Sequence, residues 1–188
     1  MFYLSQKRVK NRGYTLVELL IVVAIISIMS VVSFSNYGTS RKNVVLRQEA
    51  QKVILDLRQA QNMAMNTVKF NGQIPSGGYG IRFDVLSSDA YIIYADTDNS
   101  ATYSGAGEIF ITRAIGSPVI ISGISIGINL GSLNPASPVD INFVPPDPKV
   151  KINTNDNYFT KITLRYGGAG GPTKDITING ITGQISGN

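Results

Sequence analysis

The carboxylates between Asp96 and Glu108 have the spacing most suggestive of chemistry in this sequence. Asp96 and Asp98 stand two residues apart, as the first two ligands of a calcium-binding loop do. The segment fails the test for a helix–loop–helix calcium site, because Ala101 stands where that site requires glycine and Gly107 stands at its twelfth position. We expect an Asx-rich turn between strands, with an irregular calcium loop at Asp96 and Asp98 as the alternative and no other cofactor.

Catalytic chemistry has few residues to work with elsewhere in the chain. The 188 residues include no histidine and no cysteine, which removes Ser-His-Asp triads, thiolate nucleophiles, disulfides and the common zinc sites. The glycine-rich segment 167–174 lacks the Gly-Lys-Ser/Thr order that holds phosphate at a helix start, so it predicts a hairpin loop. The proline-rich segment 145–148 predicts a stiff structural turn. We do not expect an enzyme.

Glu18 is the most unusual carboxylate, since it stands at the start of a long apolar run. No residue from Leu19 to Ser40 is charged, and residues 19–34 are dense in Leu, Ile and Val. Such a run is typical of a membrane helix; the alternative, a buried core helix, is disfavoured because a domain of this size can hardly bury a helix that is apolar on every face. A carboxylate in a membrane costs roughly 2.5–3.5 kcal/mol, so Glu18 needs a partner or must reach the headgroups.

The positive charge of the chain is concentrated before this apolar run. The sequence has 17 basic and 12 acidic residues, and the first 13 residues contribute four of the five net positive charges. The remainder is nearly neutral, so we expect no direct nucleic-acid binding. Basic residues before an apolar segment favour a cytoplasmic N-terminus and an extracytoplasmic C-terminal part, which predicts a single-pass inner-membrane protein.

The segment from Lys10 to Ile26, KNRGYTLVELLIVVAII, resembles the class III signal of type IV pilins and pseudopilins. Its small residue stands before the apolar run, whereas an ordinary secretory signal has it afterwards. The resemblance implies that prepilin peptidase cuts between Gly13 and Tyr14 and methylates the new amine of Tyr14. Residues 1–13 are then a cytoplasmic leader, and the apolar helix stays in the mature protein.

The same resemblance implies a role for Glu18 in assembly. In the family this glutamate pairs with an N-terminal amine inside the filament and aligns an incoming subunit. Subunits at the extreme tip tend to lack it, so its presence implies a subunit with another one above it. Tyr14 and Ser35 depart from the family, which more often has phenylalanine and a helix-bending proline at these positions.

Beyond residue 40 the chain becomes amphipathic with a helical period. One apolar stripe recurs at spacings of three and four residues: Leu46, Ala50, Val53, Leu57, Ala60 and Ala64. Its three alanines favour close packing on a sheet over the alternative, a coiled coil. We expect one helix from Thr15 to about Asn66, with a hydrophobic transmembrane or filament-core part over 14–40 and an amphipathic part over 41–70. Segment 47–64 also resembles the corresponding helix of the GspH/FimT group of minor pilins.

From residue 71 onward the hydrophobic period changes from 3.6 to two. Four apolar residues face one way, with Arg82 and Asp84 on the other side, which predicts a half-buried strand: Tyr79, Ile81, Phe83 and Val85. Further strands are predicted at 91–95, 109–115, 119–128, 139–144, 161–166, 175–178 and 181–185. The resulting prediction is a pilin-like α+β fold, in which a long N-terminal helix packs on a globular antiparallel β domain over 71–188.

The resemblance implies a structural subunit, namely a minor pilin or pseudopilin of a type IV pilus or type II secretion filament, polymerised through its N-terminal helix. The implied partners are other pilin or pseudopilin subunits, prepilin peptidase, the inner-membrane assembly platform and, before assembly, membrane lipid. Two alternatives are a major pilin subunit and a single-pass membrane-anchored binding module. The protein is expected first in the inner membrane and then in the filament.

Overall fold

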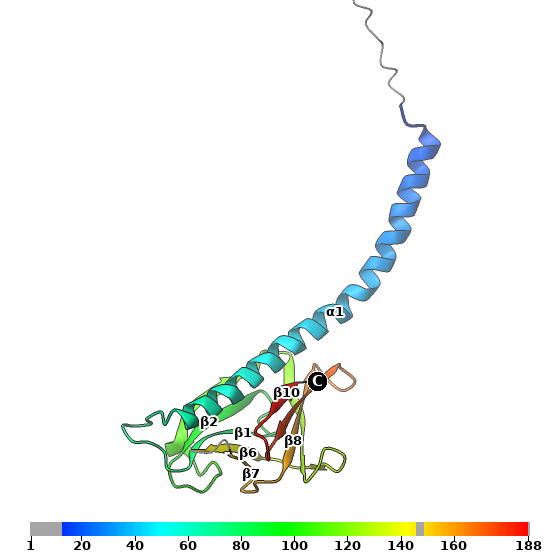
Figure 1. Ribbon diagram of the computed structural model, residues 1–188. Helices are drawn as coiled ribbons and strands as arrows, with labels where there is room; N and C mark the ends of the chain where they lie inside the picture. The colour runs from blue at the N-terminus through cyan, green and yellow to red at the C-terminus, as the bar shows by residue number, and fades with distance from the viewer. Residues whose placement is uncertain (1–12, 146–148, 188) are drawn as a thin grey trace, which may run out of the picture. The chain divides into compact units, whose positions relative to one another are not determined.

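The computed structural model describes residues 13–145 and 149–187 (Figure 1). The chain divides into two compact units between Arg41 and Lys42. Most of the predicted leader, residues 1–12, and the segment 146–148 of the predicted proline-rich turn lie outside the described residues.

One long helix, α1 (Leu16–Met65), begins in the first unit and ends in the second. Its bounds agree with the predicted 15–66 to within one residue at each end. In the second unit, the six residues of the apolar stripe are at most 2% exposed: Leu46, Ala50, Val53, Leu57, Ala60 and Ala64. Spacings of three and four residues place them on one helix face, and their burial against the domain stabilises this part of α1.

The end of α1 is closed by two backbone hydrogen bonds. The N–H of Val68 donates to the carbonyl of Met63 at 3.1 Å, and the N–H of Thr67 donates to the carbonyl of Ala64 at 3.2 Å. These bonds form the Schellman motif, which requires a left-handed residue after the helix, and Thr67 has a φ of 47°. Glycine is the usual residue at this position, so threonine is strained there.

The second unit contains two five-stranded antiparallel sheets. The first sheet has the strand order β3-β2-β1-β6-β7. Its strands in chain order are β1 (Gly78–Phe83), β2 (Ala90–Asp96), β3 (Ile109–Ala114), β6 (Val139–Val144) and β7 (Lys149–Ile152). A short 3-10 helix, η1 (Ala106–Glu108), precedes β3. Strand β7 was not predicted, because four residues with two buried side chains make too short a pattern.

The second sheet has the strand order β10-β9-β8-β4-β5. Its strands in chain order are β4 (Val119–Gly127), β5 (Asn134–Pro135), β8 (Phe159–Tyr166), β9 (Thr173–Asn179) and β10 (Ile185–Gly187). The predicted hairpin at the glycine-rich segment is confirmed, because β8 and β9 pair antiparallel across it. The two-residue edge strand β5 was not predicted.

The predicted strand over 181–185 is wrong for most of its length. The side-chain Oδ1 of Asn179 accepts the N–H groups of Ile181 (2.9 Å) and Thr182 (3.2 Å), which makes an Asx turn. Gly183 has a φ of 69°, and β10 begins only at Ile185. A local side-chain bond therefore replaces the ladder that the apolar alternation suggested.

The core of the second unit joins α1 to both sheets. One cluster of buried side chains contains the α1 stripe, the inward residues of the first sheet such as Ile81 and Ile141, and those of the second sheet such as Ile162 and Ile176. In Figure 1 the second half of α1 runs along the strands. Residues that alternate with this core point to the other face of each sheet.

Polar contacts join α1 to the first sheet and to the segment that follows it. The hydroxyl of Tyr91 donates to a carboxylate oxygen of Asp56 at 2.6 Å, and Arg113 forms an ion pair with Asp56 at 3.3 Å. The N–H of Gly116 donates to Glu49 at 3.0 Å. Both acids come from α1, so its position is determined by hydrogen bonds as well as by apolar packing.

Candidate functional site

The residues predicted to flank the cleavage, Gly13 and Tyr14, lie immediately before α1 and outside any helix or strand. The Tyr14 side chain is 83% exposed. A Cβ atom added at Gly13 would have no described atom within 4 Å. The peptide bond between them is therefore accessible, and no contact of the described residues explains the glycine.

Thr15 caps the start of α1. The N–H of Glu18 donates to the Thr15 hydroxyl at 3.2 Å, and the N–H of Leu19 donates to the Thr15 carbonyl, also at 3.2 Å. Threonine followed three residues later by glutamate is the spacing of a capping box. In this position the charge of Glu18 also faces the positive end of the helix dipole. This local role was not predicted, although the Thr-x-x-Glu spacing that signals it is present in the sequence.

The Glu18 carboxylate has no partner within the described part of the chain. No ion pair or side-chain hydrogen bond of the described residues includes it, and its side chain is exposed. The neighbouring apolar side chains of Leu16, Val17 and Leu19 are 62–81% exposed. Glu18 is thus a lone negative charge on an apolar surface and is free to pair with a cation from outside the chain.

Three serines of the apolar run make hydrogen bonds within α1. The hydroxyls of Ser27, Ser30 and Ser33 donate to carbonyls four residues earlier at 2.7–3.0 Å. Bonds of this kind let serine lie in an apolar environment, because its hydroxyl needs no water.

Within the described residues, no helix has both the length and the hydropathy needed to cross a membrane. The predicted hydrophobic segment 14–40 includes side chains that lie outside the described set: Val32, Phe34, Ser35, Asn36, Tyr37 and Thr39.

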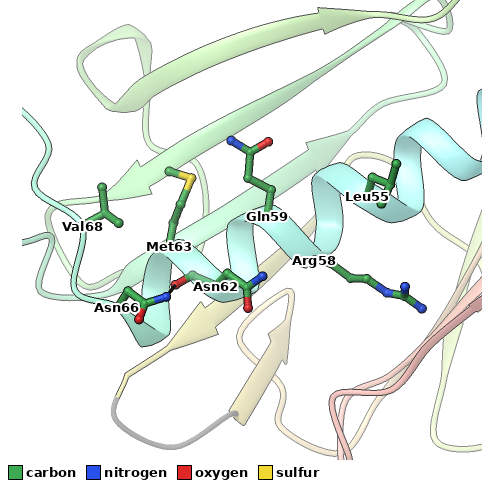
Figure 2. Close-up of a pocket in the computed structure, with 7 residues that line it drawn as sticks. All are labelled: Leu55, Arg58, Gln59, Asn62, Met63, Asn66 and Val68. Carbon is green, nitrogen blue, oxygen red and sulfur yellow. Dashed lines mark hydrogen bonds between the residues drawn. The ribbon is translucent and has the colours of Figure 1, made fainter.

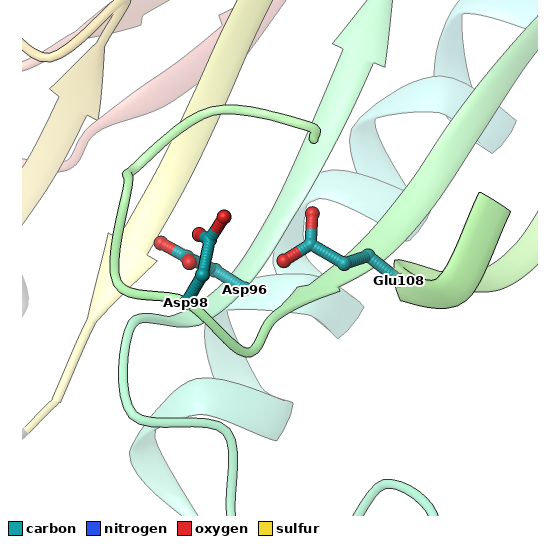
Figure 3. Close-up of side chains that lie close together, drawn as sticks. All are labelled: Asp96, Asp98 and Glu108. Atoms are coloured by element: carbon teal, nitrogen blue, oxygen red, sulfur yellow. The ribbon is translucent and has the colours of Figure 1, made fainter. Parts of the chain in front are cut away.

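A second group of candidate residues lies at the end of β2. One carboxylate oxygen from each of Asp96, Asp98 and Glu108 lies within 4.8 Å of the other two. Figure 3 shows the three side chains close together. Asp96 ends β2, Asp98 lies in the loop that follows, and Glu108 comes from η1. Asp96 and Glu108 are buried, whereas Asp98 is exposed. The fold thus adds Glu108 to the predicted candidates Asp96 and Asp98.

The loop over 97–108 is organised around the two buried carboxylates. Asp96 accepts the N–H groups of Ser100 (3.1 Å) and Ala101 (2.8 Å). Glu108 accepts the N–H groups of Thr97 (3.0 Å) and Ser104 (2.9 Å). An Asx-rich turn between strands, as the sequence predicted, is present.

The same arrangement shifts the pKa values of Asp96 and Asp98 in opposite directions. Burial raises the pKa of Asp96 above its ordinary value. Hydrogen bonds from the Ser104 and Ser100 side chains and from the Ser100 N–H lower the pKa of Asp98 to about 2. The exposed acid therefore stays ionised, while the buried one is easier to protonate.

An ion pair between β1 and β6 lies on the same face of the sheet. The register opposes Arg82 to Asp140, and the two form an ion pair at 3.1 Å. Burial raises the pKa of Asp140 to about 6, although Arg82 acts in the opposite direction. The Arg82 guanidinium also lies 5.4 Å from the centre of the Tyr103 ring, where a cation–π interaction is favourable.

Tyr94, on the same face of the sheet, has a hydroxyl group that lacks a hydrogen-bond partner. Its side chain is fully buried, and its hydroxyl has no hydrogen-bond partner. Burial raises its pKa, and the negative charges of Asp140, Asp96 and Glu108 raise it further. The register places Tyr94 and Asn142 on either side of Gly80, on this face of the sheet.

A shallow hollow of about 410 Å³ lies along the end of α1 (Figure 2). The residues that line it are Leu55, Arg58, Gln59, Asn62, Met63, Asn66 and Val68. Its only charged lining residue is Arg58, and no carboxylate contributes. This hollow has no acid–base pair.

Comparison with known proteins supports a function for the N-terminal segment. Residues 8–34 match the protein family described as the Prokaryotic N-terminal methylation motif. No curated protein and no solved structure matches the chain. The match includes Gly13, Tyr14 and Glu18 but does not reach segment 47–64, on which the resemblance to the GspH/FimT group rests. The motif is typical of type IV pilin-like proteins that prepilin peptidase processes and that assemble with other pilin subunits, which indicates a structural, membrane-anchored protein.

Proposed function

We propose that this protein is a minor pilin or pseudopilin that is processed at Gly13–Tyr14 and polymerises through α1 into a pilus or a secretion-type filament. The unpaired Glu18 carboxylate at the capped start of α1 is the observation that carries the proposal. It lies in the matched methylation motif, four residues after the Tyr14 that ends the accessible Gly13–Tyr14 bond.

The first step is hydrolysis of the peptide bond between Gly13 and Tyr14. Water adds across this bond, which leaves a carboxylate on Gly13 and a free amine on Tyr14. In the N-methylation that follows, the amine nitrogen takes a methyl group from a sulfonium methyl donor. The donor leaves as a thioether, and the amine gives up one proton. The new amine is a cation one residue before the Thr15 cap, next to the positive end of the helix dipole, so a carboxylate partner is favourable.

The second step is association of α1 with helices of other subunits. The apolar side chains between Leu16 and Val31 are 47–81% exposed, so packing against other helices would remove them from lipid or water. In these surroundings a lone carboxylate is costly, and the amine of a neighbouring Tyr14 would neutralise it. The charge pair therefore selects one register between neighbouring helices.

The Glu18→Gln substitution tests the proposal. Glutamine preserves the capping-box position and removes only the charge. We expect at least a tenfold loss of filament incorporation, with unchanged folding of the second unit by circular dichroism. Intact mass should still show loss of residues 1–13 plus one methyl group, since the cleavage bond is unaltered.

Thr15→Ala is the matched control, because it removes the cap and keeps the charge. If capping were the function of this turn, Thr15→Ala would lose incorporation and Glu18→Gln would not. Normal incorporation of Glu18→Gln, or a full-length mass of the wild-type protein from cells that contain prepilin peptidase, would contradict the proposed function.

The minor-subunit assignment rests on the similarity of segment 47–64 to the GspH/FimT group. It predicts that the protein is a small fraction of the subunits in purified filaments. A filament composed mainly of this chain would instead identify a major pilin.

A further inference from the structure

The acids at the end of β2 are a concentration of negative charge without a counter-ion. No lysine or arginine in the described part of the chain forms an ion pair with Asp96, Asp98 or Glu108. Arg82, which lies on this sheet face, is already paired with Asp140. Two of the three acids are buried, where repulsion between carboxylates is poorly screened.

Two buried oxygen atoms beside these acids also have no hydrogen-bond partner. The first is the hydroxyl of Tyr94, a residue that stands two positions before Asp96 on the same face of β2. The second is Oδ1 of Asn142, whose Nδ2 donates to Asp96 at 3.0 Å. Both side chains are fully buried, and the register places both opposite Gly80.

Gly80 makes this arrangement possible. A Cβ atom at this position would lie 2.5 Å from Cζ and from the hydroxyl oxygen of Tyr94, so only glycine leaves room for the tyrosine over β1. Buried polar atoms without partners are rare, and a bound water molecule or ion is one way in which they are satisfied. Water or an ion beside the acids would satisfy both oxygens.

We propose that Asp96, Asp98 and Glu108 bind a calcium ion, whose remaining ligands are water molecules that hydrogen-bond to Tyr94 and Asn142. Calcium takes oxygen ligands at about 2.3–2.6 Å, so ligands on opposite sides of the ion are roughly 4.6–5.2 Å apart. The three carboxylate oxygens lie within 4.8 Å of one another and therefore fit around one ion of this size. Asp96 Oδ2 and Glu108 Oε1 each accept two hydrogen bonds already, whereas Asp96 Oδ1 and Glu108 Oε2 accept one each and keep a lone pair for coordination.

Calcium fits this site better than magnesium. Magnesium requires nearly ideal octahedral geometry at about 2.0–2.1 Å and keeps most of its waters, whereas calcium accepts irregular carboxylate sites. Only Asp98 is exposed, so the ion would close the outer side of the 97–108 loop and join it to η1. Binding would therefore stabilise this loop specifically.

The experiment is a terbium luminescence titration of the full-length chain in detergent, followed by displacement with calcium. Terbium takes the same oxygen ligands and is sensitised by nearby tyrosines, and the chain contains no tryptophan to obscure the signal. We expect tyrosine-sensitised luminescence that calcium displaces with a dissociation constant of about 10⁻⁴–10⁻³ M, and that magnesium displaces at least tenfold less well.

Asp98→Asn is the informative variant, because asparagine keeps the shape and Oδ1 of this exposed residue and removes its charge. It should weaken calcium binding at least tenfold with an unchanged circular dichroism spectrum. Asp89→Asn, an exposed aspartate outside the cluster, is the control and should bind as the wild type does. A wild-type chain without calcium-displaceable luminescence would overturn the site, and so would equal binding by Asp98→Asn.

Discussion

Asp140 shows how one buried residue couples the fold to pH. Its side chain is 6% exposed and faces the Arg82 guanidinium, with the Tyr103 backbone, Glu108 and Tyr94 as the other polar groups around it. Burial raises its pKa to about 6, from the 3.8 of an unburied aspartate. The folded state therefore binds the proton more tightly than the unfolded state does.

This raised pKa gives a pH dependence with a definite sign. The stability from protonated Asp140 is fully present below pH 3.8 and is lost as the pH rises through about 6. Between about pH 4 and pH 7, this residue should lower the free energy of unfolding by about 2 kcal/mol. Asp140→Asn should remove that fall, as measured by urea unfolding with a chelator present. An Asn variant with the same fall as the wild type would show that another acid is responsible.

Thr15 and Glu18 make different contributions at the start of α1, one to helix capping and one to charge. The hydroxyl of Thr15 starts the helix by accepting an N–H, and the carboxylate of Glu18 supplies a charge that no described residue neutralises. A side chain that only capped the helix would tolerate glutamine at no cost. The difference between these two contributions makes the Glu18→Gln experiment decisive for the proposed function.

At the scale of the element, α1 ends in a conformation that its sequence does not favour. Thr67 occupies the left-handed position of the Schellman motif with a φ of 47°, and it is exposed. A β-branched residue is unfavourable there by roughly 1–2 kcal/mol, whereas glycine adopts this conformation freely but loses more chain entropy on folding.

Thr67→Gly should therefore raise the free energy of unfolding by about 0.5–1 kcal/mol. Thr112→Gly in β3, also at an exposed threonine, is the control and should lower it by a similar amount, because glycine weakens a strand. Urea unfolding of both variants checks the pair. A destabilised Thr67→Gly variant would show that the Thr67 side chain has a stabilising contact.

At the scale of the whole molecule, the second unit depends on one core that α1 shares with two sheets. Leu57 is fully buried in this core, whereas Leu55, two residues earlier on the same helix, is 60% exposed. A comparison of the two leucines therefore gives the contribution of burial to the free energy of unfolding at two positions of the same helix.

Leu57→Ala should reduce the free energy of unfolding by about 2–5 kcal/mol, because it removes apolar contact and leaves a cavity. Leu55→Ala should change it by less than about 0.5 kcal/mol. Denaturant midpoints of the two variants give this comparison. Similar losses for both would mean that the helix face around Leu55 is covered by another surface.

The sequence by itself determined the features that depend on neighbouring residues. The basic leader, glycine, capped apolar run and Glu18 form a contiguous signal, and residues 8–34 match the methylation motif. The α1 stripe and most strands follow from periods of 3.6 and two, because each period places side chains on one face whatever the rest of the fold does. For this reason β6 was predicted at its observed bounds, Val139–Val144.

Only the tertiary structure decided which distant residues meet. Asn142 reaches Asp96 across 46 positions and Arg82 reaches Asp140 across 58, because strand register, which the alternation pattern leaves open, sets those neighbours. Glu108 joins Asp96 and Asp98 through η1, at a spacing that no calcium-loop motif has. The short strands β5 and β7 form because longer neighbours supply their hydrogen-bond partners, which is information that their own few residues do not contain.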